Sequence, residues 1–455
     1  MYIEQLYTNC LAEAAYYIES EGEAAIIDPL RETEPYLELA TKRKAKIKYV
    51  FETHFHADFV SGHIDLARKA NAPIIYGPLA NTHYSVVNAV DGQEFKLGKI
   101  TLRVLHTPGH TPESSCYLLL DENGKEHAIF TGDTLFVGDV GRPDLLDGVM
   151  TREELAGMLY DSLNQKIKTL PDDVIVYPAH GPGSACGKNI GKETFSTIGE
   201  QKRLNYALKN QSKEEFIAKV TDGILPPPSY FFEDARINRE GYAAIDQVLA
   251  QNLQSLSISE VKTQIKKGAL LLDTRKPDDF EKGFIRNSLN IGLNGQFAVW
   301  VGTLVDIHQP LVLITEPGQE HESVMRLARV GYENVVGYFN RVSDWDEPLE
   351  TIRSIQAEQI KGEKAEVLDI RKPGEWSVSH YSKASFVPLA DMPDNLKTLD
   401  KKKAYLVHCA GGYRSMMATS LMKREGFENV TNIYGGFGAM VNAGIEVETE
   451  AVVAG

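Results

Sequence analysis

Six side chains that can bind a metal ion follow strand-like segments in the first half of the chain. They are His54, His56, Asp58, His110, Asp133 and His180. The first three alternate with apolar residues in THFHADF, and the others end the segments TPGH, TGD and YPAH. A single His-x-His pair is a weak signal, but four such segments in one domain indicate a shared site. Because strand ends hold ligands rigidly, we expect a metal site at the edge of a sheet.

A second motif whose residues could carry out chemistry is HCAGGYRS, which occupies residues 408–415. Cys409 follows the strand-like run KAYLV, and the helical segment MMATSLMKREG comes after the loop. Loop N–H groups and the positive end of a helix stabilise a thiolate, and Arg414 adds a nearby cation. The motif therefore predicts that Cys409 is a reactive thiol and not an inert core residue.

Two further residues stand close in sequence to the predicted metal ligands. Arg142 lies in VGDVGRPD, where its guanidinium could pair with the carboxylate or phosphate of a thiol substrate, or remain a solvated charge. Cys186 lies in HGPGSACGK, where it could bind or relay sulfane sulfur, or pack a turn. Both alternatives stay open for Cys186. We expect Cys10 and Cys116 to be core residues.

The elements that must position these residues alternate between strand-like and helical segments as far as about residue 225. Four segments show helical spacing or composition: SGHIDLARKAN, TREELAGMLYDSLNQ, KETFSTIGEQKRLNYALK and SKEEFIAKV. The three prolines at 226–228 then favour an extended strap, because proline cannot continue a helix. We place a domain boundary near residue 250.

An internal repeat divides the rest of the chain. LLDTRKPDDF around Asp273 matches VLDIRKPGEW around Asp369, and GYENV from Gly331 matches GFENV from Gly426. The copies are too long for a solenoid unit, so we expect three domains, at residues 1–250, 251–350 and 351–455. Where the second copy has the Cys409 loop, the first reads LITEPGQEHES. The first copy is therefore expected to be catalytically inactive.

The composition of the chain argues against several classes of function. Apolar residues make up 43% of the chain and charged residues 24%, as in globular proteins. The formal net charge of −15 argues against nucleic acid as a partner. No apolar run approaches the roughly 18 residues that span a bilayer, so no membrane is expected. Four cysteines are too few for a disulfide scaffold, and the start shows no signal peptide, so we expect a cytoplasmic protein. Homo-oligomer formation stays open.

The metal-binding pattern resembles the metallo-β-lactamase superfamily and its HxHxDH motif. The resemblance covers about residues 1–225 and implies an α/β fold, an αβ/βα sandwich of two sheets between helices. Position 59 departs from the motif, since Phe59 stands where dinuclear members have a histidine that holds a second metal. We therefore expect one metal ion per chain.

The mononuclear branch of that superfamily is the persulfide dioxygenases. The resemblance to them implies Fe(II), one per chain, held by His54, His110 and Asp133, a face of two histidines and one carboxylate that suits oxygen chemistry. The remaining members of the cluster would surround the ligands and orient them or bound water: His56, Asp58 and His180. Arg142 matches the position of the family's substrate arginine.

The C-terminal motif resembles rhodanese sulfurtransferases over about residues 350–455. The spacing Cys409-x4-Arg414 is one residue shorter than the loop of cysteine phosphatases, which favours a sulfur atom over a phosphate. The whole chain thus resembles a persulfide dioxygenase–rhodanese fusion. Such a fusion would use a low-molecular-weight thiol persulfide and O2 to make sulfite and thiol. Cys409 would then transfer sulfane sulfur to sulfite, giving thiosulfate.

Two other functions remain open at this stage. One is a zinc-dependent thioester hydrolase of the glyoxalase II type fused to a sulfurtransferase, which would use a metal-activated water and usually two metals. Phe59 argues against it. The other is a sulfur carrier without enzymatic activity, whose metal site would be structural and closed by four protein ligands. The sequence does not identify the thiol.

Overall fold

The computed structural model describes residues 1–145 and 149–449. The chain divides into two compact units. The N-terminal unit comprises Met1–Val248 with the short segment Ala328–Gly331, and the C-terminal unit comprises Leu249–Leu327 and Tyr332–Gly455. Each unit has its own apolar core and is described separately.

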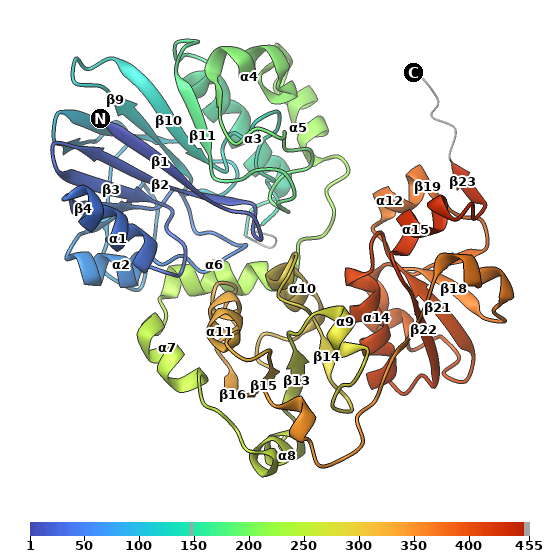
Figure 1. Cartoon of the computed structure of the whole chain (residues 1–455). Helices are drawn as coiled ribbons and strands as arrows, with labels where there is room; N and C mark the ends of the chain where they lie inside the picture. Colours follow the sequence, from blue (N-terminus) through green and yellow to red (C-terminus); the bar gives the residue numbers. More distant parts are fainter. Residues whose placement is uncertain (146–148, 450–455) are drawn as a thin grey trace. The chain divides into compact units, whose positions relative to one another are not determined.

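Two six-stranded sheets face each other in the N-terminal unit (Figure 1). The first, in spatial order, contains β1 (Tyr2–Thr8), β2 (Glu13–Ser20), β3 (Glu23–Ile27), β4 (Lys46–Phe51), β5 (Ile74–Tyr76) and β6 (Val87–Asn88). The second contains β12 (Ser196–Thr197), β11 (Ile175–Pro178), β10 (Glu126–Gly132), β9 (Ser115–Leu120), β8 (Ile100–His106) and β7 (Glu94–Leu97).

Neighbouring residues of the strands point to opposite faces, and both faces are apolar. Tyr16 packs in the cluster between the sheets, whereas Tyr17 packs in the cluster beneath the outer helices of the first sheet. In the second sheet Leu119 points inward and Leu118 outward. Burial on both faces explains why the strand segments read as continuous apolar runs.

Helices cover the outer faces of both sheets (Figure 1). The first sheet carries α1 (Glu34–Arg43) and α2 (His63–Ala70), and the second carries α3 (Arg152–Ser162), α4 (Ile198–Leu204) and α5 (Lys213–Thr221). Helix α3 begins with a capping box in which Thr151 and Glu154 bond each other's backbone N–H groups. The predicted α/β sandwich is confirmed.

Two segments differ from the sequence prediction. The helix expected from residue 192 begins only at Ile198, because Ser196 and Thr197 pair with β11 as an edge strand. After the three prolines, which belong to no helix or strand, the chain forms α6 (Phe231–Glu240) and α7 (Ile245–Asn252). These two helices were not predicted, and α6 reaches the metal-binding segment.

The C-terminal unit contains two parallel sheets, in which four strands follow the same order and the second has one more edge strand. It also contains a two-stranded antiparallel sheet of β19 (Ser379–Tyr381) and β23 (Val447–Thr449). The first repeat has β14 (Leu289–Asn290), β13 (Leu270–Asp273), β15 (Leu311–Ile314) and β16 (Val335–Phe339). The second has β17 (Arg353–Ile355), β22 (Asn429–Ile433), β21 (Ala404–His408), β18 (Glu366–Asp369) and β20 (Ala384–Phe386). Its main helix, α14 (Tyr413–Arg424), follows β21; the helix after β15 is α11 (Glu320–Ala328).

Both repeats contain the same ion pair at the end of their first central strand. The Arg275 guanidinium binds the Asp273 carboxylate through two nitrogens, and Arg371 binds Asp369 in the same way. The repeat seen in the sequence is thus a structural repeat.

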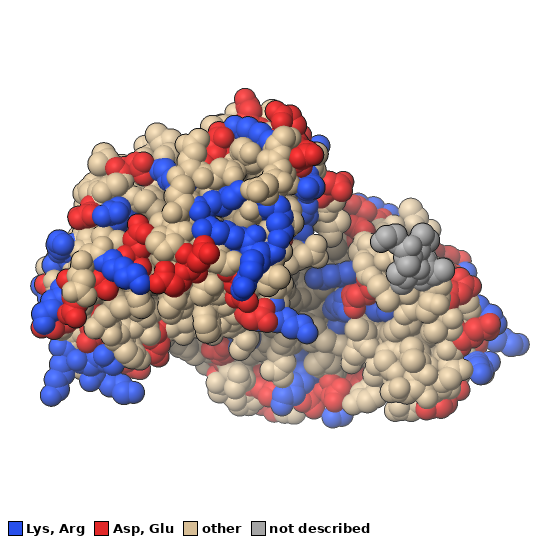
Figure 2. Space-filling model, turned by 90° about the horizontal axis from the view of Figure 1, so that it is seen from above, with Lys and Arg blue, Asp and Glu red and all other residues tan. Residues whose placement is uncertain are grey.

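Charge is dispersed over the surface. Figure 2 shows acidic side chains scattered among basic ones on the face in view, so the net charge of −15 forms no single acidic field there. Among residues 1–145 and 149–449, no helix is both long enough and apolar enough to cross a bilayer.

Candidate metal centre and cysteine loop

Three of the predicted ligands come together at the ends of three strands. His54 follows β4, His110 follows β8, and Asp133 follows β10. Nε2 of His110 lies 3.4 Å from Oδ2 of Asp133, and Nε2 of His54 lies 4.0 Å from the same oxygen. All three side chains are buried, and one ligand atom from each lies within 4.8 Å of the others. The two sheets meet at this edge, which is why residues so far apart in sequence converge.

Backbone and side-chain acceptors fix the histidine tautomers. Nδ1 of His110 donates a hydrogen bond to the Arg142 carbonyl at 2.8 Å, which leaves Nε2 as the free acceptor. Thr53 donates its hydroxyl proton to Asp28, so Nδ1 of His54 must donate to the Thr53 oxygen, 2.9 Å away. Both Nε2 atoms are thereby directed toward Asp133 with a lone pair available.

Unpartnered polar atoms indicate that this site fits a cation. Nε2 of His110 and both carboxylate oxygens of Asp133 are buried without a hydrogen-bond partner among the described residues. Burial, reinforced by the neighbouring histidines, holds the pKa of His54 well below its usual value, so its imidazole is neutral. Neutral imidazoles and a carboxylate are the ligands of a non-haem iron or zinc site, and two histidines with one carboxylate leave positions open for reactants.

A second group lies beside the first. Nε2 of His180 is 3.4 Å from Asp58 and 3.5 Å from the other oxygen of Asp133, and Cys186 lies within reach of both Asp58 and His180. Burial opposes protonation of His180, but the two carboxylates outweigh it and raise its pKa. Burial, then Asp58 and Asp133, raise the pKa of Cys186 well above its usual value, so its thiol stays protonated.

His56 points away from both groups. Its Nε2 lies 3.1 Å from Asp28 and 3.6 Å from Glu52, and the three form a third buried cluster. The fully buried Phe59 ring packs against the His56 ring with 4.3 Å between ring centres. Phe59 therefore occupies its position as a packing residue and offers no donor atom.

Arg142 has partners within the protein. Its guanidinium binds the Asp144 carboxylate at 2.6 and 2.8 Å and donates to the carbonyl groups of Ala185 and Leu225. Its backbone N–H donates to the Cys186 carbonyl. These contacts tie together the loops around the second group, and a substrate anion would have to compete with Asp144. The substrate-binding role of Arg142 stays a prediction.

The sequence analysis did not identify several residues that support the site. Asp28 and Glu52 both end strands and precede a turn, as the predicted ligands do, so the same signal could have found them. Asn238 from α6 carried no such signal. Its amide donates to the carbonyl groups of His56 and Phe59 and accepts from the N–H of Ser61.

This arrangement predicts a large effect of Asn238 on stability. Asn238→Leu should lower the free energy of unfolding by about 2–4 kcal/mol, because three buried backbone groups lose their partner. Urea unfolding followed by circular dichroism measures the change. Asn210, which is exposed, supplies the control, and Asn210→Ala should stay within about 0.5 kcal/mol of the wild type. Equal stabilities for the two variants would contradict this role of α6.

The Cys409 loop in the C-terminal unit has the predicted geometry. Cys409 ends β21 and is 1% exposed, and the loop leads directly into α14. The N–H of Gly412 donates to the cysteine sulfur at 3.1 Å, and the Ser415 hydroxyl oxygen lies 3.7 Å from it. Loop N–H groups and the start of a helix therefore surround the sulfur with positive dipoles.

Arg414 is paired with a carboxylate. Its guanidinium binds Glu375 through two nitrogens, at 2.5 and 2.7 Å. Burial opposes ionisation of Glu375, but the bound guanidinium outweighs it and lowers the pKa of this carboxyl. The sequence analysis did not assign a role to Glu375. Substrate binding at Arg414 would take place beside this pair.

The segment GGF, from Gly435 to Phe437, packs against the backbone of the Cys409 loop. The Phe437 N–H donates to the Cys409 carbonyl at 2.7 Å. Gly436 has a φ of +57°, and a Cβ placed there would lie 2.4 Å from that carbonyl oxygen. Only glycine fits at this approach.

Known proteins match both units. Residues 8–180 match the family model of the metallo-beta-lactamase superfamily, and residues 257–347 and 353–443 each match that of the rhodanese-like domain. The persulfide dioxygenase ETHE1 of Homo sapiens is 32% identical over 212 residues, which cover 45% of this chain and 74% of that protein. The cytoplasmic hydroxyacylglutathione hydrolase of Arabidopsis thaliana is 34% identical over 179 residues, which cover 38% and 66%.

A solved structure agrees with these matches. A metallo-beta-lactamase from Staphylococcus aureus is 31% identical, with a TM-score of 0.65, and the match covers 75% of this chain and 99% of that one. The predicted succession of one metallo-beta-lactamase domain and two rhodanese-like domains is confirmed, and the bounds 1–250, 251–350 and 351–455 stay predictions. The chain belongs to the metallo-beta-lactamase superfamily, with two tandem rhodanese-like domains after that domain, and is a homologue of the persulfide dioxygenases.

Proposed function

We propose that the chain oxidises a low-molecular-weight thiol persulfide with O2 and then transfers sulfane sulfur to sulfite. The first reaction balances as RSSH + O2 + H2O giving RSH and H2SO3. In the second, the Cys409 thiolate takes the outer sulfur of a second RSSH, which leaves as RSH, and passes it to sulfite, which releases thiosulfate and the Cys409 thiolate. Homology to persulfide dioxygenases and to rhodanese-like domains supports this pairing of activities.

Phe59 is the observation that carries the first half of the proposal. The ring is fully buried against His56 and offers no donor atom to a second metal. His54, His110 and Asp133 would then hold one ion. An iron(II) ion held there supplies the one-electron chemistry that O2 requires. The chain's own groups direct both imidazoles at the site, and burial keeps the His54 imidazole neutral and excludes bulk water.

The loop geometry supports the second half. The Gly412 N–H donates to the Cys409 sulfur, which is the atom that would accept sulfane sulfur. Arg414, five residues after Cys409, interacts with its side chain, and a guanidinium there can bind anionic sulfite or thiosulfate. In the first repeat the loop after β15, residues 315–319, has neither cysteine nor arginine. Sulfur transfer is therefore assigned to the second repeat.

A zinc-dependent thioester hydrolase is the rival function. It is favoured by the second group, since Asp58, His180 and Cys186 could together hold a second ion. The Arabidopsis thaliana relative is named as a hydrolase of this kind. The number and identity of the bound metals separate the two functions.

Metal analysis tests the proposal directly. Protein purified without oxygen is expected to contain close to one iron per chain and little zinc, measured by elemental analysis. Phe59→His should raise the occupancy of a second metal, because it adds a donor at the residue that follows Asp58, where the superfamily motif has a histidine. Phe59→Leu is the matched control, since it removes the ring without adding a donor. Two tightly bound metals in the wild type would contradict the mononuclear site.

A further inference from the structure

Helix α14 connects the Cys409 loop to the first repeat of the C-terminal unit. The helix starts at Tyr413, four residues after Cys409, and its first turn contacts the segment after β14. The Tyr413 hydroxyl donates to the Gly292 carbonyl at 2.7 Å, although the two residues belong to different repeats. A residue of the cysteine loop is thus held by the repeat that lacks a cysteine.

Glycines in the first repeat make room for the Tyr413 ring. Gly295 has a φ of +96°, and a Cβ placed on it would lie 3.0 Å from the edge of the ring. A Cβ on Gly292 would lie 3.6 Å from the opposite edge. The Tyr413 ring therefore packs against glycine backbone on both sides of its hydrogen bond. We call Gly292, Gly295 and the segment between them the glycine seat.

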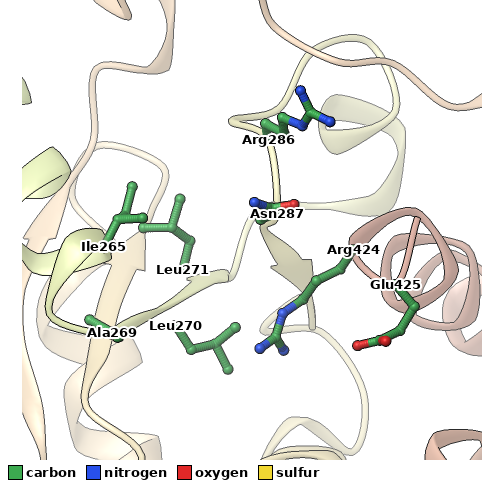
Figure 3. A pocket seen from close by; sticks show the side chains of 9 residues that line it. Ile265, Ala269, Leu270, Leu271, Arg286, Asn287, Arg424 and Glu425 are labelled. Atoms are coloured by element: carbon green, nitrogen blue, oxygen red, sulfur yellow. The ribbon is translucent and has the colours of Figure 1, made fainter.

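The contact between α14 and the first repeat continues along the helix, and a cavity lies at its far end. Met416 packs with Phe280, Phe284 and Ile352, and the Ser420 hydroxyl accepts from the N–H of Asn290 at 3.0 Å. At the far end of α14 a cavity of about 350 Å³ separates the repeats (Figure 3). It is lined there by Arg424 and Glu425 on one side and by Leu270, Arg286 and Asn287 on the other. The two repeats are therefore in contact at the end of α14 that carries the cysteine loop.

The residues between the sulfur and Tyr413 explain why an anchor matters. Gly411 and Gly412 are the most flexible part of the loop, and Gly412 adopts a φ of +108°. Gly412 also supplies the N–H that points at the sulfur. Without a fixed neighbour, two consecutive glycines could rotate this N–H away. Tyr413 is the residue that follows them, and its hydroxyl is bonded outside the loop.

We propose that Tyr413 is a positioning residue for Cys409 and that the cysteine-less repeat, through its glycine seat, holds the loop in the geometry that favours the thiolate. The proposal extends the sulfur-transfer role proposed for Cys409 and gives the inactive repeat a function. Tyr413 touches neither the sulfur nor a substrate in this account. It acts through the Gly412 N–H.

Alkylation of Cys409 tests the positioning without relying on any enzymatic activity. Tyr413→Phe removes only the hydroxyl. The rate at which iodoacetamide modifies Cys409 at pH 7, read on the Cys409 peptide by mass spectrometry, should fall about two- to tenfold, the size expected for one lost hydrogen bond. The profile of this rate against pH should move to higher pH. A role limited to stability would leave both unchanged in folded protein.

A substitution in the cysteine-less repeat tests the same contact between Tyr413 and the glycine seat. Gly295→Ala should displace the Tyr413 ring and slow the alkylation of Cys409 similarly, although residue 295 belongs to the cysteine-less repeat. Tyr405→Phe is the matched control, because Tyr405 donates to the Asp400 carbonyl within the second repeat and should react as the wild type does. Thermal unfolding confirms that each variant is folded.

The outcomes separate this proposal from the one it rests on. Wild-type alkylation in a folded Tyr413→Phe variant would overturn the positioning role, whatever Gly295→Ala does. Sulfur transfer from thiosulfate to cyanide is measured in parallel. If the wild type transferred no sulfur while the alkylation profiles still shifted, the positioning role would stand and the proposed function of Cys409 would fail.

Discussion

Asp133→Ala is expected to abolish O2 consumption with a thiol persulfide. Asp133 lies between both histidines and has two buried oxygens without other partners, so its loss removes the only carboxylate of the first group. Loss of a residue that merely orients a ligand costs about 10- to 100-fold, so loss of the ligand should exceed about 100-fold. An oxygen electrode measures the rate, and elemental analysis should show that iron is lost with it.

The same variant tests whether the two units work independently. Sulfur transfer at Cys409 should remain close to the wild-type rate, because the loop belongs to the other unit. Asp173→Ala is the control, since Asp173 is an exposed carboxylate of the same unit that pairs with Lys125. If both activities vanished in an Asp133→Ala protein that is still folded, the assignment of one reaction to each unit would be wrong.

Cys409→Ser is expected to change the final product and leave the oxidation running. A serine hydroxyl is a poor nucleophile near neutral pH and cannot hold sulfane sulfur. O2 consumption should continue, sulfite should accumulate, and thiosulfate should fall to the uncatalysed background. Chromatographic analysis of both anions after equal O2 consumption measures the effect.

A second cysteine provides the comparison. Cys10 is a free, half-buried cysteine in the turn between β1 and β2, and Cys10→Ser should give wild-type amounts of thiosulfate. Unchanged thiosulfate in Cys409→Ser would move sulfur transfer to another thiol. Cys186 is then the first candidate, because it lies beside the metal-binding groups.

The positions of the ligands could be predicted from the sequence because each follows a strand. The strands supply apolar runs that can be read locally, and the side chain after a strand emerges at the edge of the sheet. Six side chains were predicted to share a site in this way. The resemblance to persulfide dioxygenases then implied the set His54, His110 and Asp133, and the structure brings these three together. The partner of Arg142 was also local, since Asp144 stands two residues later, but Arg142 was interpreted as a substrate residue and Asp144 was not considered.

Contacts between distant segments could not be predicted. Asn238 donates to the backbone of His56, which lies 182 residues earlier in the sequence, and no sequence pattern marks an asparagine for that contact. The orientation of His56 toward Asp28 depends on how the strand ends are spaced in the folded sheets. The contact of Tyr413 with Gly292 likewise depends on how two repeats pack, whereas the repeat itself was evident from matching residues.

The hydrogen bonds that hold the histidines have a consequence for the order of assembly. His110 is oriented by the Arg142 carbonyl and His54 by Thr53 and Asp28, and these bonds involve no ion. The sheets around them have apolar cores large enough to form without a bound ion. Small zinc domains, in contrast, fold only when the metal arrives. We therefore expect the site to form before an ion enters, and ligand type, geometry and cellular metal supply would then select the ion.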